Sequence, residues 1–280
     1  MNGTLTTKAT SGQYKKYEYR YGTEQVTGTH VFTTKSGQSI APAISAKSRT
    51  PLSKMTPTRP EAQNVIAKTN ACMFDRDTTR FLGFFYQGPN EPMYINGVAF
   101  TTAPSSSNMY SDIKFYPSFC VKKDGSATIR WFSRKDDLNM ALRYCDYVIG
   151  AYHPLVYDSQ CVFNEYVREP DALGGRMLYD IAVPESPGSR FNTKIDMRDD
   201  AQRTLLGHKS SGAFVMVATD NKMSVETAAN MMQDLGCDFA VNMDGGSCSE
   251  MRIASGYGPA GRVTIQGGTL LNTAVCAYVK

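Results

Sequence analysis

Hydrophobic and polar positions alternate along residues 14–48 in short segments rich in Tyr, Val and Thr, with glycines between them. Alternation with a period of two is typical of strands that bury one face, and glycine favours the turns that join such strands. We therefore expect antiparallel strands here. A proline-rich connector should follow over 51–60, and Pro60 suits the first turn of a short helix that extends to Ala67.

The clearest unit of the chain covers residues 213–247. Ala213–Thr219 is a continuous apolar run bounded by turn residues, which predicts a buried strand. Ser224 then offers an N-cap and Gly236 a C-terminal glycine for a helix, and Asp238–Met243 is the next strand. The apolar residues of the helix fall on one face: Val225, Ala228, Ala229, Met232 and Leu235. Strand, helix and strand predict a βαβ unit with a right-handed crossover.

Two further strands are expected at Thr69–Asp75 and Asp146–Val156, and a long excursion over 158–202. The pattern as a whole predicts an α+β fold: mixed β-sheets with a C-terminal βαβ unit and few helices. We expect an N-terminal β-rich segment, residues 1–60, packed on the same domain as residues 61–280.

The composition limits the classes of function. Hydrophobic residues make up 41% of the 280 and charged residues 20%, which indicates a folded core and not a disordered chain. The net charge of +4 is compatible with an anionic substrate. Lys15 and Lys16 lie among tyrosines, as expected of a strand face that is exposed to solvent. The sequence has no concentrated basic stripe, so it does not predict a nucleic-acid partner. No apolar run is long enough to predict a membrane span.

The seven cysteines are odd in number and irregularly spaced, and none forms a Cys-x-x-Cys pair. We expect free thiols in a reduced protein, with no structural zinc, no other metal site and no cofactor. The N-terminus is polar and lacks the apolar core of a signal peptide. The sequence therefore predicts synthesis and folding in a cytoplasm.

The most informative segment is the run from Asn242 to Ser249. Asp244 follows a predicted strand, and Gly245 and Gly246 can adopt backbone conformations that let successive amides bind an anion. Asp-Gly is also common in ordinary hairpin turns. The position at the carboxyl end of a strand, where ligands bind in α/β sheets, favours a functional site.

This segment resembles the Asn-Leu-Asp-Gly-Gly-Gly-Ser-Ser signature of the phosphodiester glycosidase family, which includes the enzyme that uncovers mannose 6-phosphate by removing N-acetylglucosamine. Three other stretches resemble family motifs in the same order. Asn70–Asp75 is similar to Asn-Gly-Gly-Phe-Phe-Asp, Gly150–Val156 to Gly-Gly-Gly-Pro-Leu-Leu-Val, and Arg203–Gly207 to Arg-Thr-Ala-Ile-Gly. The resemblance covers roughly residues 65–279.

The chain also departs from the family pattern. Ala71, Cys72 and Ser247 stand where the family has glycine, and Thr269–Asn272 stands where an arginine is common. These changes leave open a diverged substrate or a loss of activity.

The resemblance implies hydrolysis of the sugar C1–O bond of a sugar-1-phosphodiester, of the N-acetylglucosamine-1-phospho type or in a glycan such as teichoic acid or capsule. Asp244, Arg203 and Asp75 are the catalytic candidates, with Asp244 as the carboxylate and Arg203 as the phosphate clamp. A surface salt bridge to Asp199 or Asp200 is the alternative role for Arg203. The candidates for substrate binding are Asn70, Gly245, Gly246, Ser247, His208 and Glu250. A lone histidine is more often structural than catalytic, and an acid after a turn is often only solvated.

Two other functions compete with hydrolysis of a phosphodiester-linked sugar. The first is a non-catalytic carbohydrate-binding or structural module on the same fold, for instance in a phage tail or virion, with assembly partners there. The second rests on Asp75–Thr79, which contains the Asp-x-Asp-x-Thr pattern of haloacid dehalogenase phosphatases. Such phosphatases also need a later pair of acidic residues that holds magnesium, and Asp244 has no acidic neighbour to complete such a pair.

Overall fold

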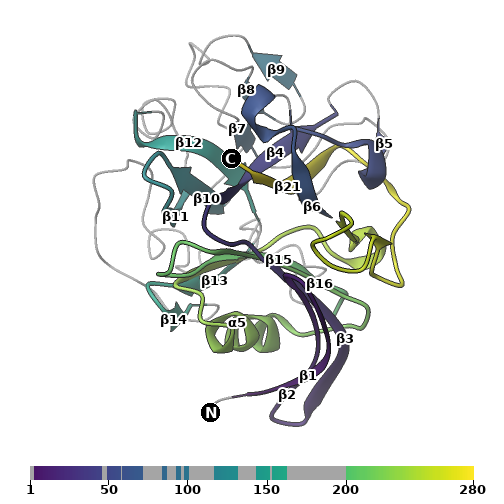
Figure 1. Ribbon diagram of the computed structural model, residues 1–280. Helices are drawn as coiled ribbons and strands as arrows, with labels where there is room; N and C mark the ends of the chain where they lie inside the picture. Colours follow the sequence, from purple (N-terminus) through teal and green to yellow (C-terminus); the bar gives the residue numbers. More distant parts are fainter. Residues whose placement is uncertain are drawn as a thin grey trace.

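The structure is a computed structural model, and all structural statements concern the residues that it describes (Figure 1). These are residues 3–45, 49–57, 59–71, 117–131, 143–151, 153–162 and 200–280, together with the backbone of three short strands at 84–86, 93–95 and 98–100. Asp75 and most of the predicted excursion over 158–202 lie outside this part of the chain.

The largest sheet has eight strands in the order β1-β2-β3-β16-β15-β17-β13-β14. Every neighbouring pair in this sheet is antiparallel. Its strands are β1 (Thr4–Ser11), β2 (Tyr14–Tyr21), β3 (Glu24–Thr33), β13 (His153–Tyr157), β14 (Gln160–Cys161), β15 (Thr204–His208), β16 (Phe214–Thr219) and β17 (Phe239–Asn242).

Two smaller sheets and a two-stranded pair complete the described fold. The six-stranded sheet has the order β11-β10-β12-β7-β8-β9, the five-stranded sheet the order β19-β18-β6-β21-β4, and β20 pairs with β5. The bounds in the six-stranded sheet are β7 (Phe84–Tyr86), β8 (Met93–Ile95), β9 (Val98–Phe100), β10 (Pro117–Lys122), β11 (Ala127–Trp131) and β12 (Cys145–Gly150). The remaining strands are β4 (Gln38–Ile44), β5 (Thr50–Pro51), β6 (Val65–Asn70), β18 (Met251–Ile253), β19 (Gly261–Arg262), β20 (Leu270–Leu271) and β21 (Thr273–Val279).

The eight-stranded sheet is buried on both faces along its central strands. In β16, Val215 and Val217 pack into the cluster that includes the helix, whereas Phe214 and Met216 pack into the larger cluster shared with the other sheets. Successive side chains of a strand point to opposite faces, so a strand covered on both sides is apolar throughout. This explains the uninterrupted apolar run of the sequence.

The helix α5 (Val225–Asp234) covers one face of this sheet, below β13, β15 and β16 in Figure 1. The Ser224 hydroxyl accepts a hydrogen bond from the Thr227 amide at 3.1 Å, and Gly236 has a φ of 81° just beyond the helix end. The cap and the stop predicted from the sequence are therefore confirmed. No helix among the described residues is long and apolar enough to cross a membrane.

The sheets differ from the expected mixed arrangement. The strands on either side of α5 do not pair with each other, because β15 lies between β16 and β17 and is antiparallel to both. Every strand pair that the structure describes is antiparallel, so the expectation of mixed parallel and antiparallel pairing was wrong for these strands. The order of elements in the sequence does not reveal that β15, which precedes β16 in the chain, lies between β16 and β17.

The predicted helix from Pro60 to Ala67 was also wrong. A single 3₁₀ turn, η2 (Pro60–Ala62), is followed directly by the strand β6 (Val65–Asn70). The strand β6 lies between β18 and β21, where Val65 and Ile66 fit a pleated surface. Tertiary pairing therefore overrides the local preference for a helix. A second 3₁₀ turn, η1 (Leu52–Lys54), lies in the predicted connector.

The single strand predicted over Asp146–Val156 is in fact two strands in different sheets. β12 ends at Gly150 and belongs to the six-stranded sheet, and β13 begins at His153 beside β17. One apolar run therefore supplies strands to both sheets.

Candidate functional site

The candidate site lies at one end of the eight-stranded sheet. Thr204 at the start of β15 pairs with Ala218 near the end of β16, and Leu205 pairs with Asn242 at the end of β17. The segments that enter β15 and leave β16 and β17 are therefore neighbours. This register brings Arg203 and Asp244 to the same end of the sheet.

Asn70, at the end of β6, holds both ends of the Asp244 segment. Its side-chain Nδ2 donates to the main-chain carbonyl of Asp244 at 2.7 Å, and its Oδ1 accepts from the Glu250 amide at 3.1 Å. The Thr204 hydroxyl donates to the same Oδ1 at 2.7 Å, and the Asp244 amide donates to the Ala71 carbonyl at 2.8 Å. Asn70 is 1% exposed, so its side chain serves to position the loop in this structure.

The two glycines of the turn are required for different reasons. A Cβ on Gly245 would lie 2.4 Å from the Gln202 carbonyl oxygen, which is closer than any side chain tolerates. Gly246 has a φ of 65°, and its amide donates to the same carbonyl at 2.8 Å. The turn is thus fitted against the residue that precedes Arg203. A 3₁₀ turn, η4 (Gly246–Cys248), follows.

Ser247 and Glu250 connect this turn to the loop before β20. Ser247 is exposed, and its carbonyl accepts from the Thr269 hydroxyl at 3.1 Å. The Glu250 side chain is buried, with one carboxylate oxygen 3.0 Å from Arg252 Nη1 and the other 2.6 Å from the Gly268 amide. The sequence suggested that Glu250 binds substrate, whereas in this structure both of its oxygens are engaged within the protein.

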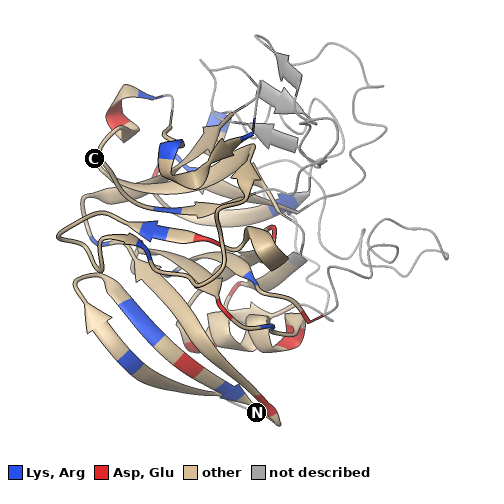
Figure 2. Ribbon diagram, turned by 90° about the vertical axis from the view of Figure 1, so that its right-hand side faces the viewer, with Lys and Arg blue, Asp and Glu red and all other residues tan. Residues whose placement is uncertain are grey.

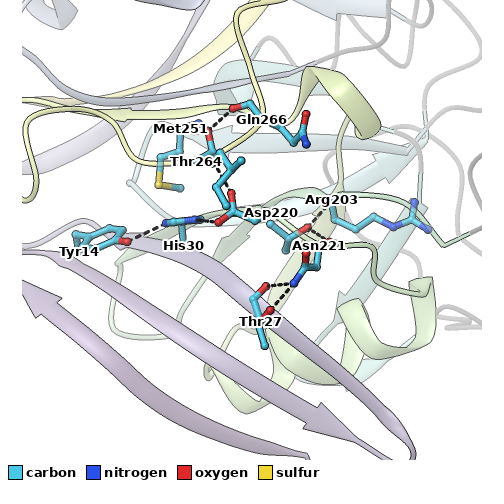
Figure 3. Close-up of polar contacts among 11 residues, drawn as sticks. Tyr14, Thr27, His30, Arg203, Asp220, Asn221, Met251, Thr264 and Gln266 are labelled. Atoms are coloured by element: carbon cyan, nitrogen blue, oxygen red, sulfur yellow. Dashed lines mark hydrogen bonds and ion pairs between the residues drawn. The ribbon is translucent and has the colours of Figure 1, made fainter.

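Arg203, for which a surface salt bridge to Asp199 or Asp200 was the alternative role, is a buried residue. Its relative exposure is 2%. The Arg203 amide donates to the Thr219 hydroxyl at 2.8 Å, and Nε donates to the Met223 carbonyl at 2.9 Å. Figure 3 shows the guanidinium pointing away from His30 and Asp220. Asp244, at 6% exposure, is buried as well.

A buried chain of polar groups beside the site had no signal in the sequence. Tyr14 Oη and His30 Nδ1 are 2.8 Å apart, and His30 Nε2 is 2.8 Å from Asp220 Oδ2 (Figure 3). The other Asp220 oxygen accepts from the Ile265 amide at 2.6 Å. Tyr14 and His30 are 16 residues apart in sequence, and His30 and Asp220 are 190 residues apart, so no sequence motif could reveal these contacts.

The charge on Asp220 is favoured by these contacts. Burial alone would raise the pKa of Asp220, but the hydrogen bonds from His30 and the Ile265 amide lower it below its ordinary value. Burial, with a contribution from Asp220, raises the pKa of Tyr14 to about 12. These polar contacts thus anchor the loop that follows β19 to the same end of the sheet as Asp244.

His208 is not brought together with the other predicted site residues. It lies at the opposite end of β15 from Thr204, roughly 13 Å away for four residues of a strand. Asp75, a further catalytic candidate, lies outside the described residues. Within the described part of the chain, no three His, Cys, Asp or Glu side chains are grouped as metal ligands would be.

The six cysteines that the structure describes are all free thiols. Burial raises the pKa of Cys237 and of Cys276 to about 12, so neither thiol is ionised near neutral pH. Positive and negative side chains both lie on the strands near the N-terminus (Figure 2), and Lys8 and Arg20 both contact Glu18.

Comparison with known proteins gives the following matches. A family model described as phosphodiester glycosidase matches residues 63–274. The catalytic domain of zebrafish N-acetylglucosamine-1-phosphodiester alpha-N-acetylglucosaminidase, auto-inhibited by its pro-peptide, matches with a TM-score of 0.63 and 14% identity, over 100% of this chain and 83% of that one. A hypothetical protein from Synechocystis matches with a TM-score of 0.55 and 14% identity, over 99% of this chain and 64% of that one. No curated protein sequence matches the chain significantly. At this identity the structural matches show a shared fold.

Proposed function

The chain belongs to the phosphodiester glycosidase family, as its four ordered motifs predicted, and we propose that it hydrolyses the sugar C1–O bond of a sugar-1-phosphodiester. N-acetylglucosamine linked through phosphate is the substrate type that we favour. The zebrafish relative is named for such a substrate, and the mild positive net charge is compatible with an anionic one.

The observation that carries this proposal is the meeting of three motif segments at one end of the eight-stranded sheet. Asn70 comes from β6, Arg203 precedes β15, and Asp244 follows β17. The hydrogen bonds from Asn70 to the Asp244 carbonyl and from Gly246 to the Gln202 carbonyl connect all three segments.

In the proposed reaction, Asp244 is the carboxylate that acts at C1. Cleavage of a glycosidic bond passes through an oxocarbenium-like state, which a nearby carboxylate stabilises. Water supplies a hydroxyl to C1, the water proton passes to Asp244, and the electron pair of the C1–O bond leaves with the phosphate monoester. Because a phosphate monoester is a stable leaving group, little help from a general acid is required.

Arg203 is assigned to the phosphate of the substrate. A guanidinium donates two parallel hydrogen bonds to a phosphate, and burial strengthens such charged contacts. The bond from Nε to the Met223 carbonyl fixes the orientation of the side chain. The amides of Gly245 and Gly246 and the exposed Ser247 are the further candidates for contact with the substrate.

A panel of phosphate-linked sugars tests the proposal. We expect release of free sugar from UDP-N-acetylglucosamine or from a related phosphodiester, teichoic-acid fragments included, and none from a p-nitrophenyl N-acetylglucosaminide, which lacks the phosphate. The anomer of the first product, followed by NMR, distinguishes direct attack of water from attack by Asp244 itself. Saturable binding of these compounds without any hydrolysis would instead favour a carbohydrate-binding module.

A further inference from the structure

A polar cavity lies at the end of the sheet opposite Asp244. Its volume is about 420 Å³, within the range of small-molecule sites. The cavity is formed by three turns: Lys35–Gln38 between β3 and β4, 124–126 between β10 and β11, and 210–214 between β15 and β16. His208 and Lys280 complete the wall.

The turns around this cavity are held in place by hydrogen bonds. The Lys280 amide donates to the Gly37 carbonyl at 2.9 Å, and the Lys35 amide donates to Gln38 Oε1 at 2.8 Å. The Phe214 amide donates to the Thr34 hydroxyl at 2.8 Å. A ligand would therefore meet a preformed wall and would pay little for ordering it.

The wall combines hydroxyls with positive charge. Ser36, Ser126, Ser210 and Ser211 all line it. The ammonium groups of Lys35 and Lys280 pair with no carboxylate of a described residue. The carboxylate of Asp124 is instead occupied within its own turn, where it accepts from the Ser126 amide at 2.9 Å and from the Ser126 hydroxyl at 2.6 Å.

The buried His208 also lines the cavity. Its side chain lies in the cavity wall with a relative exposure of 5%, and its Nε2 has no hydrogen-bond partner among the described residues. A buried polar atom without a partner costs about 1–3 kcal/mol, which a ligand or an ordered water recovers. The ring of His208 packs edge-on against Phe214, with ring centroids 5.0 Å apart.

We propose that this cavity is an accessory site for a phosphorylated sugar, with the phosphate near Lys35 and Lys280 and the sugar hydroxyls on the serine-rich turns. The class of ligand rests on the proposed function, whereas the cavity does not. His208 is thereby assigned to this accessory site and not to the Asp244 site. Because the sites lie at opposite ends of β15, a single small substrate cannot occupy both.

Amide NMR spectra with N-acetylglucosamine 1-phosphate test this site directly. This monoester is not a substrate of the proposed reaction. We expect saturable shifts of the Gly37, Gly125 and Gly212 amides, with binding weakened at least tenfold in the Lys35→Ala/Lys280→Ala double variant and unchanged in Lys123→Ala, a nearby lysine outside the cavity wall. Hydrolysis of UDP-N-acetylglucosamine by the double variant should stay at the wild-type rate.

Two results would overturn the accessory site. The first is no shift of these three amides up to about 10 mM ligand, a concentration that detects even millimolar affinity. The second is an equal set of shifts with inorganic phosphate alone, which would indicate an anion site without sugar recognition. The substrate panel tests the proposed hydrolysis separately, because it measures the release of free sugar.

Discussion

The side-chain amide of Asn70 donates a hydrogen bond of 2.7 Å to the main-chain carbonyl of Asp244. The two residues are 174 positions apart in sequence. The same Asn70 side chain accepts from the amide of Glu250, so one buried residue fixes the beginning and the end of the turn that carries Asp244. A carboxylate acts efficiently only when its geometry is fixed, and Asn70 supplies that constraint.

Replacement of Asn70 by Ala should reduce both stability and activity. It removes the hydrogen bonds that Asn70 makes with the Asp244 carbonyl, the Glu250 amide and the Thr204 hydroxyl, at a total cost of about 3–5 kcal/mol. Because the turn loses its anchor, kcat should fall by at least tenfold well below the melting temperature. Denaturant unfolding and steady-state kinetics measure the two effects.

Asn272→Ala is the matched control for this variant. Asn272 is also fully buried, and its side chain donates to the Ser45 carbonyl at 3.0 Å and makes no hydrogen bond to the Asp244 turn within the described part of the chain. We expect a loss of stability with kcat close to that of the wild type. Equal losses of kcat in the two variants would mean that Asn70 is no more than a general stabiliser of the fold.

Ala substitutions at the two glycines of the turn should differ in their cost. At Gly245 the new Cβ collides with the Gln202 carbonyl, so Gly245→Ala should cost about 2–3 kcal/mol and lower activity by displacing the turn from Arg203. At Gly246 no atom lies within 4 Å, and only the positive φ opposes Ala, at about 1–2 kcal/mol.

Gly256→Ala separates these two costs. Gly256 has a φ of 87°, and a Cβ there would also have no neighbour within 4 Å. In thermal unfolding, Gly256→Ala should therefore lose as much stability as Gly246→Ala. A Gly245→Ala protein that is as stable and active as the wild type would show that the turn is not tightly fitted against Gln202.

Glu250→Gln should affect stability more than catalysis. Gln cannot accept from both Arg252 and the Gly268 amide as the carboxylate does, and a loss of about 1–3 kcal/mol follows. If both oxygens remain engaged during turnover, kcat should stay within about tenfold of the wild type. A stable Glu250→Gln protein with a loss of several orders of magnitude would instead establish Glu250 as a second catalytic carboxylate.

The stability of the protein should depend on His208 in mildly acid solution. Burial lowers the pKa of His208 below its ordinary value of 6.5, so the unfolded chain binds a proton that the folded chain resists. The free energy of unfolding should therefore fall as the pH drops below about 6.5. Urea unfolding at several pH values above about 5 should show a weaker dependence in His208→Gln than in the wild type. The same slope in both proteins would contradict this effect.

The sequence predicted those parts of the fold whose signals are local. The apolar run that forms β16, the Ser224 cap and the Gly236 stop of α5 are each set by a few adjacent residues. The β6 strand was mistaken for a helix, because its pairing with β18 and β21 is decided by residues about 180 positions later or more. The apolar run over 146–156 gave no sign that it divides between two sheets.

For the candidate site, the signals in the sequence are local as well. The Asp244-Gly245-Gly246 turn is a contiguous motif, and the structure brings Arg203 and Asn70 to it. The sequence could not show that Asn70 bonds to the protein itself or that His208 lies at the far end of β15. These facts depend on strand register, which a slip of one residue would change entirely.

The most direct test of the central claim is the Asp244→Asn variant, with kcat and the thermal midpoint measured together on a phosphate-linked sugar that the wild type hydrolyses. Asn keeps the size of the side chain and a carbonyl acceptor but removes the charge. The account predicts a loss of about 10²–10⁴ in kcat, or about 3–5 kcal/mol, with a thermal midpoint close to that of the wild type. A stable Asp244→Asn protein that retains full activity would contradict the assignment of Asp244 as the catalytic carboxylate.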